Sequence, residues 1–212
     1  MFRKSQIIIA IAILMVFAGC SDTRGTADVD LGKSYVSVNF IIDKTSKFEP
    51  VIAIWIENPQ NGETAVLYHT DKAGVRDLAL PVWSELESDD AVSGATPKEP
   101  EFSKSFQIPD KFAGNSFIIY IEANVSYDYN EYYVENAKTS DTCYSDVNGQ
   151  PSVIWKGVIR AFTGADGLVR INPSIAGHGD VLGKNNQISD EIGKITTAAR
   201  ILKDFDIIYH PM

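Results

Sequence analysis

Residues 51–56 read Val-Ile-Ala-Ile-Trp-Ile, a run without a polar side chain. A strand with one face in water alternates apolar and polar residues, whereas a strand buried on both faces is apolar throughout. Pro50 precedes the run, and the turn residues Asn-Pro-Gln-Asn-Gly follow at 58–62. We therefore expect a strand in the interior of a sheet, with residues 64–70 returning beside it as an antiparallel hairpin partner.

Strand patterns continue on both sides of this run. Apolar residues alternate with polar ones at Val36, Val38, Phe40 and Ile42. Further strands are expected at 102–108, 115–126, 152–162 and 204–209, where aromatic and β-branched residues are frequent. Short strands separated by turn residues predict an all-β fold, an immunoglobulin-like antiparallel β-sandwich.

One segment has helical spacing instead. Apolar residues recur about every three to four positions between 188 and 202, and Ser189 with Asp190 could cap the first turn. Gly193 and two threonines oppose this helix. We expect a short helix near the C-terminus.

The beginning of the chain resembles a lipoprotein export signal. Arg3 and Lys4 precede an apolar run at 7–18, and the small residues Ala18 and Gly19 come directly before Cys20. The run is shorter than the roughly 20 residues of a membrane-spanning helix. We expect residues 1–19 to be a signal peptide, residues 20–30 to be a lipidated Cys20 and a flexible tether, and residues 31–212 to form a single domain. A secreted protein cleaved nearby, without lipid, is the alternative.

This export signal sets the compartment and the expected partners. The protein would be lipid-anchored to a membrane of the cell envelope through Cys20, outside the cytoplasm, in a periplasmic or outer-membrane location. Loss of Arg3 and Lys4 with the leader leaves 17 basic against 28 acidic residues, a formal charge of −11. Such a surface repels phosphate backbones, so we expect no nucleic-acid partner. Cys143 then has no cysteine to pair with, and a structural thiol is expected.

Residues 90–96, Asp-Ala-Val-Ser-Gly-Ala-Thr, suggest a chemical function. They resemble the motif through which secreted flavin-carrying domains acquire covalent flavin mononucleotide (FMN) on a threonine. By this resemblance Thr96 would receive the flavin, and Asp90, Ser93 and Gly94 would belong to the motif. The simpler alternative is a surface turn, since Ser-Gly-Ala-Thr-Pro suits one.

Several blocks of the chain resemble one family. Residues 51–58, 80–83, 90–97 and 121–123 are similar to the secreted family called domain of unknown function twenty-two seventy-one. The resemblance spans roughly residues 33–212 and is clearest over 51–125. It implies a sandwich-like fold and an association with extracytosolic flavin redox systems and with the transferase that attaches flavin to threonine.

Two departures from the flavin motif are visible. Ala91 stands where glycine is preferred, and residues 97–100, Pro-Lys-Glu-Pro, replace the small hydroxyl residues and helix that follow the motif in flavin-carrying domains. A threonine hydroxyl is scarcely acidic, so a separate transferase must activate the reaction. An attached isoalloxazine would need aromatic or apolar walls, for which the candidates are Trp83, Trp55, Phe102 and the tyrosines.

Other candidate sites are weaker. A tyrosine cluster at Tyr127, Tyr129, Tyr132 and Tyr133 predicts either a contact surface for a sugar, a flavin or a protein, or a loop that covers the end of the sandwich. The segment 177–180, Gly-His-Gly-Asp, and the segment 146–149, Asp-Val-Asn-Gly, are interpreted as turns rather than metal sites. No metal-ligand spacing and no catalytic triad order is present in the sequence, although residues distant in sequence could still form a triad.

Two functions of different classes follow. The first is an exported lipoprotein of flavin-based electron transfer, a carrier or accessory protein rather than an enzyme, with a flavin transferase and membrane redox proteins as partners. The alternative is a non-catalytic sandwich that binds a partner protein or a glycan at the cell envelope. Fold alone does not separate them.

Overall fold

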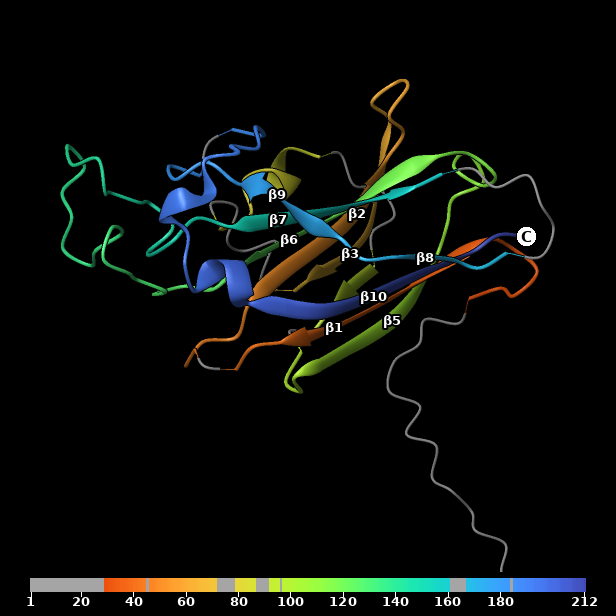
Figure 1. The fold of residues 1–212 in the computed structure, drawn as a ribbon, viewed down its shortest axis with the longest axis horizontal. Coiled ribbons are helices and arrows are strands. Elements are labelled where there is room, and N and C mark those ends of the chain that lie inside the picture. Colours follow the sequence, from red (N-terminus) through yellow and green to blue (C-terminus); the bar gives the residue numbers. More distant parts are fainter. Residues whose placement is uncertain are drawn as a thin grey trace, which may run out of the picture.

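The computed structural model describes residues 29–44, 46–71, 79–86, 92–95, 97–160, 167–183 and 185–212. Within these residues the chain forms two β-sheets that pack face to face, which confirms the expected all-β sandwich (Figure 1). The expected signal peptide, Cys20 and most of the expected tether lie outside the described residues.

The smaller sheet has four strands in the order β5-β1-β10-β8. Their bounds are Glu101–Gln107 for β5, Tyr35–Ile42 for β1, Leu202–His210 for β10 and Val169–Ile171 for β8, and all neighbours are antiparallel. Along β1 every second side chain is buried, as the sequence predicted. The chain therefore brings its first and last described strands side by side in the middle of this sheet.

The larger sheet has six strands in the order β4-β3-β2-β6-β7-β9. Their bounds are Val92–Gly94 for β4, Thr64–Thr70 for β3, Val51–Glu57 for β2, Phe117–Asn124 for β6, Val153–Ile159 for β7 and Ser174–His178 for β9. Strand β2 lies between β3 and β6, so the predicted interior strand and its hairpin with β3 are confirmed. The pair β3 and β4 is parallel, unlike the other pairs of this sheet.

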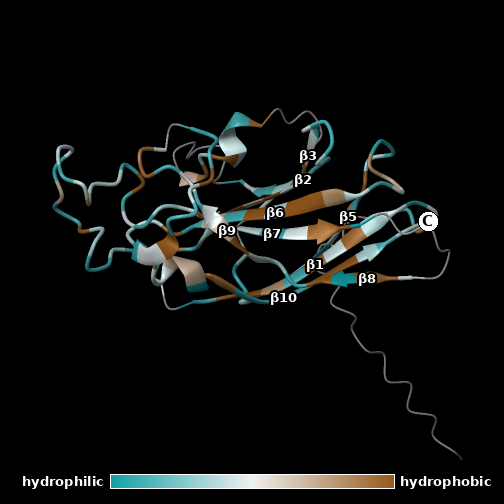
Figure 2. Ribbon diagram, turned by 45° about the horizontal axis from the view of Figure 1, so that its top comes forward, coloured by the Kyte–Doolittle hydropathy of each residue, from teal (hydrophilic) through white to brown (hydrophobic). Residues whose placement is uncertain are grey.

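Two hydrophobic clusters explain why β2 is apolar on both faces. The main core lies between the sheets and includes Ile52, Ile54 and Ile56. A second cluster covers the outer face of the six-stranded sheet and includes Ala53 and Trp55. In Figure 2 the hydrophobic colour marks β6, the strand that lies beside β2. Strand β1 instead alternates between hydrophobic and hydrophilic positions. Burial of a large apolar side chain contributes about 1.5–3 kcal/mol, so both faces of β2 stabilise the sandwich.

The prediction of one short helix near the C-terminus is wrong. The segment contains two one-turn 3-10 helices, η4 at Ile192–Lys194 and η5 at Ala198–Arg200, with Ile195 in an extended conformation between them. Ile195 is buried whereas Ile192 is 45% exposed, so the apolar spacing does not form one buried stripe. Side chains from elsewhere bind the backbone instead: Gln150 Oε1 accepts a hydrogen bond from Thr196 N at 2.7 Å.

Candidate functional site on the outer face of the six-stranded sheet

The described part of the flavin-like motif forms the edge strand β4. Ser93 pairs with His69 and Gly94 with Thr70 of strand β3. Ser93 and Ala95 are exposed, and the backbone of Gly94 accepts a hydrogen bond from Asp71 N at 2.8 Å. Asp90 and Thr96 lie outside the described residues. The described centre of the motif therefore lies on an edge strand of the six-stranded sheet.

Gly94 has a packing role of its own. A Cβ atom at this position would lie 2.8 Å from Cε2 of Tyr68, which is closer than real Cβ contacts. Tyr68 is fully buried and its hydroxyl donates to Ala95 O at 3.3 Å, so its ring cannot move aside freely. The glycine of the motif is thus required by this sheet edge whether or not a flavin is attached.

A row of paired residues crosses the outer face of the sheet from this edge. Paired residues on neighbouring strands project to the same side of a sheet. The row contains, in strand order, Ser93, His69, Ala53, Glu122, Ile154 and Gly177. The motif serine therefore shares a face with an imidazole and a carboxylate that are distant in sequence.

Glu122 is the most unusual member of this row because its side chain is completely buried. Its Oε1 accepts from Ser152 Oγ at 2.6 Å and from Val82 N at 3.4 Å, and its Oε2 accepts from Trp83 N at 2.8 Å. Burial raises the pKa of Glu122 to about 7, although these hydrogen bonds favour the charged form. The carboxyl group thus attaches a distant segment to the sheet and titrates near neutral pH.

The attached segment, residues 79–86, covers the outer face. It contributes Leu80 and Val82 to the outer cluster and contains the 3-10 helix η3 at Trp83–Glu85. The Trp83 ring is buried, with its centroid 5.1 Å from that of His69. No described residue accepts a hydrogen bond from Trp83 Nε1. Trp83, one of the aromatic walls predicted for a flavin, thus lies next to His69 of the row that contains Ser93.

Two other predicted aromatic walls, Trp55 and Phe102, are packed inside hydrophobic clusters. Trp55 is buried and stacks on Tyr120 at 5.2 Å, and Phe102 is buried between the sheets, where it stacks on Phe40. Neither ring is available on the surface beside β4. These two residues are therefore core, as apolar aromatics in strands usually are.

The glycine-flanked histidine also belongs to the outer-face packing. His178 is buried, and its Nδ1 lies 2.7 Å from Gly179 O. A Cβ atom on Gly179 would come within 2.5 Å of Pro81 Cγ and 2.4 Å of Ser152 Oγ, so the loop lies closely against the covering segment. The structure thus places this imidazole inside the fold rather than on an exposed loop.

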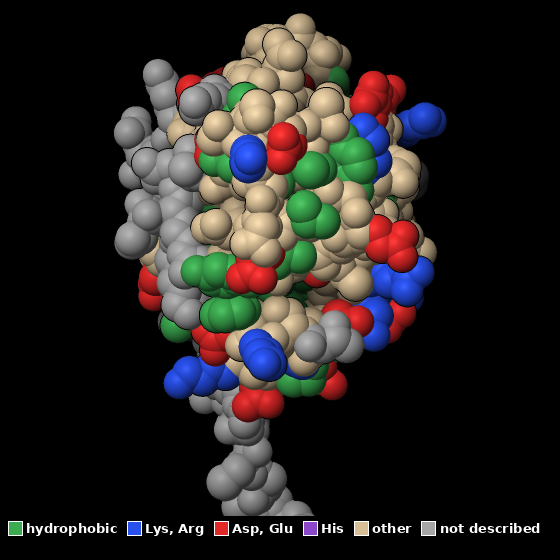
Figure 3. Space-filling model, turned by 90° about the vertical axis from the view of Figure 1, so that its left-hand side faces the viewer, with side chains coloured by type: hydrophobic (Ala, Val, Ile, Leu, Met, Phe, Trp, Pro, Cys, Tyr) green, Lys and Arg blue, Asp and Glu red, His purple; other side chains and the backbone are tan. Residues whose placement is uncertain are grey.

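The tyrosine cluster divides between two roles. Tyr133 is buried and joins the main core, which agrees with the alternative of a loop that covers the end of the sandwich. Tyr127 is 52% exposed and packs against Phe48, with ring centroids 4.8 Å apart. Figure 3 shows this end of the molecule, where hydrophobic side chains lie among acidic and basic ones. The cluster therefore both covers the core and presents aromatic surface.

The remaining sequence candidates show no metal site. Asn148 and Gly149 both have positive φ, which is consistent with a turn at 146–149, and Asp146 accepts a hydrogen bond from the Tyr144 hydroxyl. Cys143 is a half-buried free thiol. Across the described residues, no group of three or more His, Cys, Asp or Glu side chains is arranged to hold a metal ion.

Sequence reasoning missed His69, Ser152 and the role of Glu122. One signal was present: Glu122 is the only charged residue of β6, between strands that are themselves strongly apolar. A carboxylate flanked by such strands is expected to be buried and to have hydrogen-bond partners. The local sequence could not predict which partners these are, namely the backbone N–H groups of Val82 and Trp83.

Comparisons with known proteins add no identification. No protein-family model matches the chain, and neither a curated protein nor a solved structure shows significant similarity to it. In the described part of the chain, no helix has both the length and the apolar character needed to cross a membrane. The family resemblance therefore depends on the quoted sequence blocks alone.

Proposed function

We propose that this protein is an exported lipoprotein of the cell envelope that takes part in extracytosolic flavin-based electron transfer and carries FMN covalently on Thr96. The observation that carries the proposal is the motif at 90–96, downstream of an export signal. The exposure of Ser93 and Ala95 on an edge strand supports it, because a modifying enzyme must reach this part of the chain. Cys20 would hold the protein to the membrane through its lipid.

The attachment is a phosphoryl transfer. The Thr96 hydroxyl oxygen would attack the FMN phosphorus of flavin adenine dinucleotide, the bond between the two phosphates would break, and adenosine monophosphate would leave. The threonine proton would pass to a base of the transferase. No electrons are transferred in this step, so the flavin arrives oxidised and gains its electrons later from membrane redox proteins.

The family and the finer fold class are part of the same proposal. We assign the chain to the domain family of unknown function named above, on the four blocks that resemble it, and the sandwich to the immunoglobulin-like class. Two sheets around one core and the antiparallel pairing of most strands support the fold class. The sandwich would act as a rigid support for the flavin and as a docking surface for its redox partners, without catalytic residues of its own.

Coexpression with a flavin transferase tests the proposal. We expect the intact mass to rise by one FMN less one water, together with flavin fluorescence of the protein band in a denaturing gel. Both signals should disappear in Thr96→Ala and persist in Thr142→Ala, which changes an exposed threonine outside the motif. An unmodified protein in cells where a known substrate of the transferase is flavinylated would contradict the proposal.

A second candidate function is a non-catalytic binding module for a partner protein or a glycan. The exposed ring pair Phe48 and Tyr127 favours it, since aromatic side chains with a free face are common at binding surfaces. Crosslinking in intact envelopes distinguishes the two functions. Under this candidate, Phe48→Ser with Tyr127→Ser should abolish crosslinks that Thr96→Ala leaves unchanged.

A further inference from the structure

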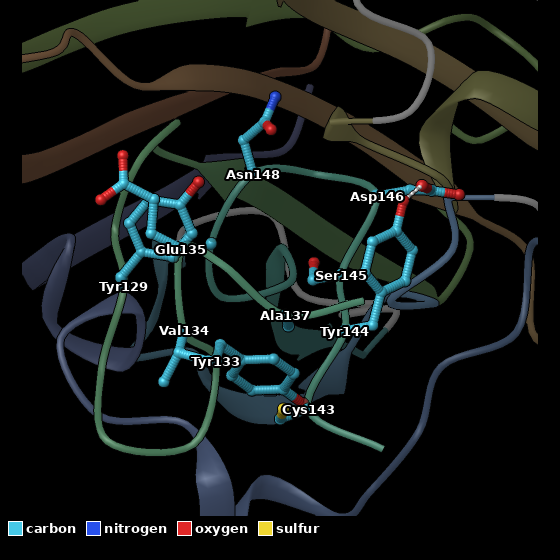
Figure 4. A pocket seen from close by; sticks show the side chains of 11 residues that line it. Tyr129, Tyr133, Val134, Glu135, Ala137, Cys143, Tyr144, Ser145, Asp146 and Asn148 are labelled. Atoms are coloured by element: carbon cyan, nitrogen blue, oxygen red, sulfur yellow. Dashed lines mark hydrogen bonds between the residues drawn. The ribbon is translucent and has the colours of Figure 1, made fainter. Parts of the chain in front are cut away.

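A small pocket lies in the loop region between β6 and β7, at the end of the sandwich that carries the tyrosine cluster. Its walls come from two stretches of this region, one around residues 129–137 and one around 143–149. Figure 4 shows Tyr133 and Val134 on one side, Tyr144 with Asp146 on another, and Tyr129 with Glu135 opposite. All residues that line it are described, and the flavin motif is not among them.

The size of the pocket limits what it can hold. Its volume is about 100 Å³. Pockets for drug-sized ligands usually measure about 300–1,000 Å³, and an apolar cavity of about 150 Å³ accommodates benzene. An isoalloxazine or a pyranose ring is therefore too large for this pocket. A group the size of a methylated ammonium fits.

The chemistry of the walls favours a cation. Three tyrosines, Tyr129, Tyr133 and Tyr144, are among the residues that line the pocket, together with the acidic residues Glu135 and Asp146. Among the described residues that line it there is no lysine or arginine. The faces of aromatic rings attract cations, and neighbouring carboxylates add to this attraction. An anion would meet two negative charges and no positive one.

The same loop already holds an ammonium group against a tyrosine. Lys194 Nζ lies 4.2 Å from the ring centroid of Tyr132 and donates a hydrogen bond to its hydroxyl at 2.9 Å. Tyr132 packs edge to face on Tyr133, with centroids 4.9 Å apart. A tyrosine next to the pocket therefore makes, within the protein, the kind of contact that the pocket offers to a ligand.

The pocket walls are held by backbone hydrogen bonds. Asp146 N donates to Val181 O at 2.9 Å, and Tyr127 N donates to Asn148 O at 2.6 Å. The Tyr144 hydroxyl donates to the Asp146 carboxylate, which fixes a ring and a charge together. Because these groups are ordered before a ligand arrives, little conformational entropy is lost on binding.

We propose that this pocket binds an ammonium group, of the kind carried by a lysine side chain or a choline-type headgroup. The cation would lie among the rings of Tyr129, Tyr133 and Tyr144 with its charge balanced by Glu135 and Asp146. This site is independent of Thr96 and would give the protein a contact with a cationic partner at the envelope surface.

Titration of the full-length protein in detergent tests the site. The ring signals of isotope-labelled tyrosine are followed by NMR while choline, methylammonium or the amide of N-acetyl-lysine is added. We expect saturable shifts with these cations and none with the uncharged carbon isostere of choline. Tighter binding of choline would indicate a headgroup as the natural ligand, and tighter binding of the lysine amide would indicate a protein side chain.

Variants distinguish binding in the pocket from attraction of cations to the overall negative charge of the protein. Glu135→Gln and Asp146→Asn should each weaken binding about fivefold, the effect of roughly 1 kcal/mol. Glu131→Gln is the control, because Glu131 is exposed in the same loop and does not line the pocket. Absence of saturable shifts, equal binding of the uncharged isostere, or an equal effect of Glu131→Gln would overturn the proposal.

Discussion

The side chain of Glu122 accepts a hydrogen bond from the backbone N–H of Trp83 at 2.8 Å, across 39 residues of sequence. This bond connects the centre of the six-stranded sheet to the segment that covers it. The carboxyl group thus holds residues 82 and 83 of this covering segment against the sheet. Its burial and its titration near neutral pH make this attachment sensitive to pH.

The first prediction concerns stability against pH. The folded protein holds the Glu122 proton more tightly than the unfolded chain, whose glutamate has the ordinary pKa of 4.5. Between pH 4.5 and about 7 the folded state therefore binds more protons than the unfolded chain. The contribution of Glu122 to the free energy of unfolding falls as the pH rises through this range, by roughly 3 kcal/mol in all. Urea unfolding at a series of pH values measures this loss.

Glu122→Gln is the matched variant, since its amide resembles the protonated acid and can donate to Ser152 Oγ while accepting from Trp83 N. The stability difference between the variant and the original protein should grow in favour of Gln as pH rises from 4.5 to about 7. A difference that stays constant over this range would show that Glu122 does not titrate there.

The second prediction concerns Gly94. Gly94→Ala would place a methyl group 2.8 Å from the buried ring of Tyr68, and such overpacking costs about 1–3 kcal/mol. Gly193→Ala is the control, because no atom lies within 4 Å of the new Cβ there. We expect Gly94→Ala to lower the urea midpoint of unfolding without changing the slope of the free energy against urea concentration. The free energy of unfolding of Gly193→Ala should stay within about 0.5 kcal/mol of the original protein.

The third prediction concerns Thr70 at the end of β3. Its hydroxyl is buried and accepts a hydrogen bond from Ile52 N at 3.1 Å. Thr70→Val keeps the shape but leaves this buried N–H without an acceptor, which costs about 1–3 kcal/mol. Thr70→Ser keeps the hydroxyl acceptor, so its free energy of unfolding should fall less than that of Thr70→Val. Thermal unfolding of the Thr70→Val and Thr70→Ser variants measures this difference. Equal stability of the two variants would refute this role of the hydroxyl.

Local sequence patterns predicted the strands that are long enough to show a period. Strand β1 alternates, and β2 is apolar on both sides, so each revealed how many of its faces are buried. The strands β4, β8 and β9 have three to five residues, too few to display a period, and were not predicted. The helical spacing at 188–202 misled because its apolar residues pack on separate parts of the fold.

Neighbouring residues alone predicted the β-sandwich and its apolar central strand, both of which the structure confirms. They also led us to expect an export signal at residues 1–19 and a motif at 90–96 that resembles a flavin attachment site. The tertiary structure was needed to show that the centre of the motif lies on a parallel edge strand beside Tyr68, that Glu122 is buried beneath residues 79–86, and that three tyrosines line a pocket. These relationships join segments far apart in the chain. Their energies come from long-range packing and hydrogen bonds, which leave no local pattern to read.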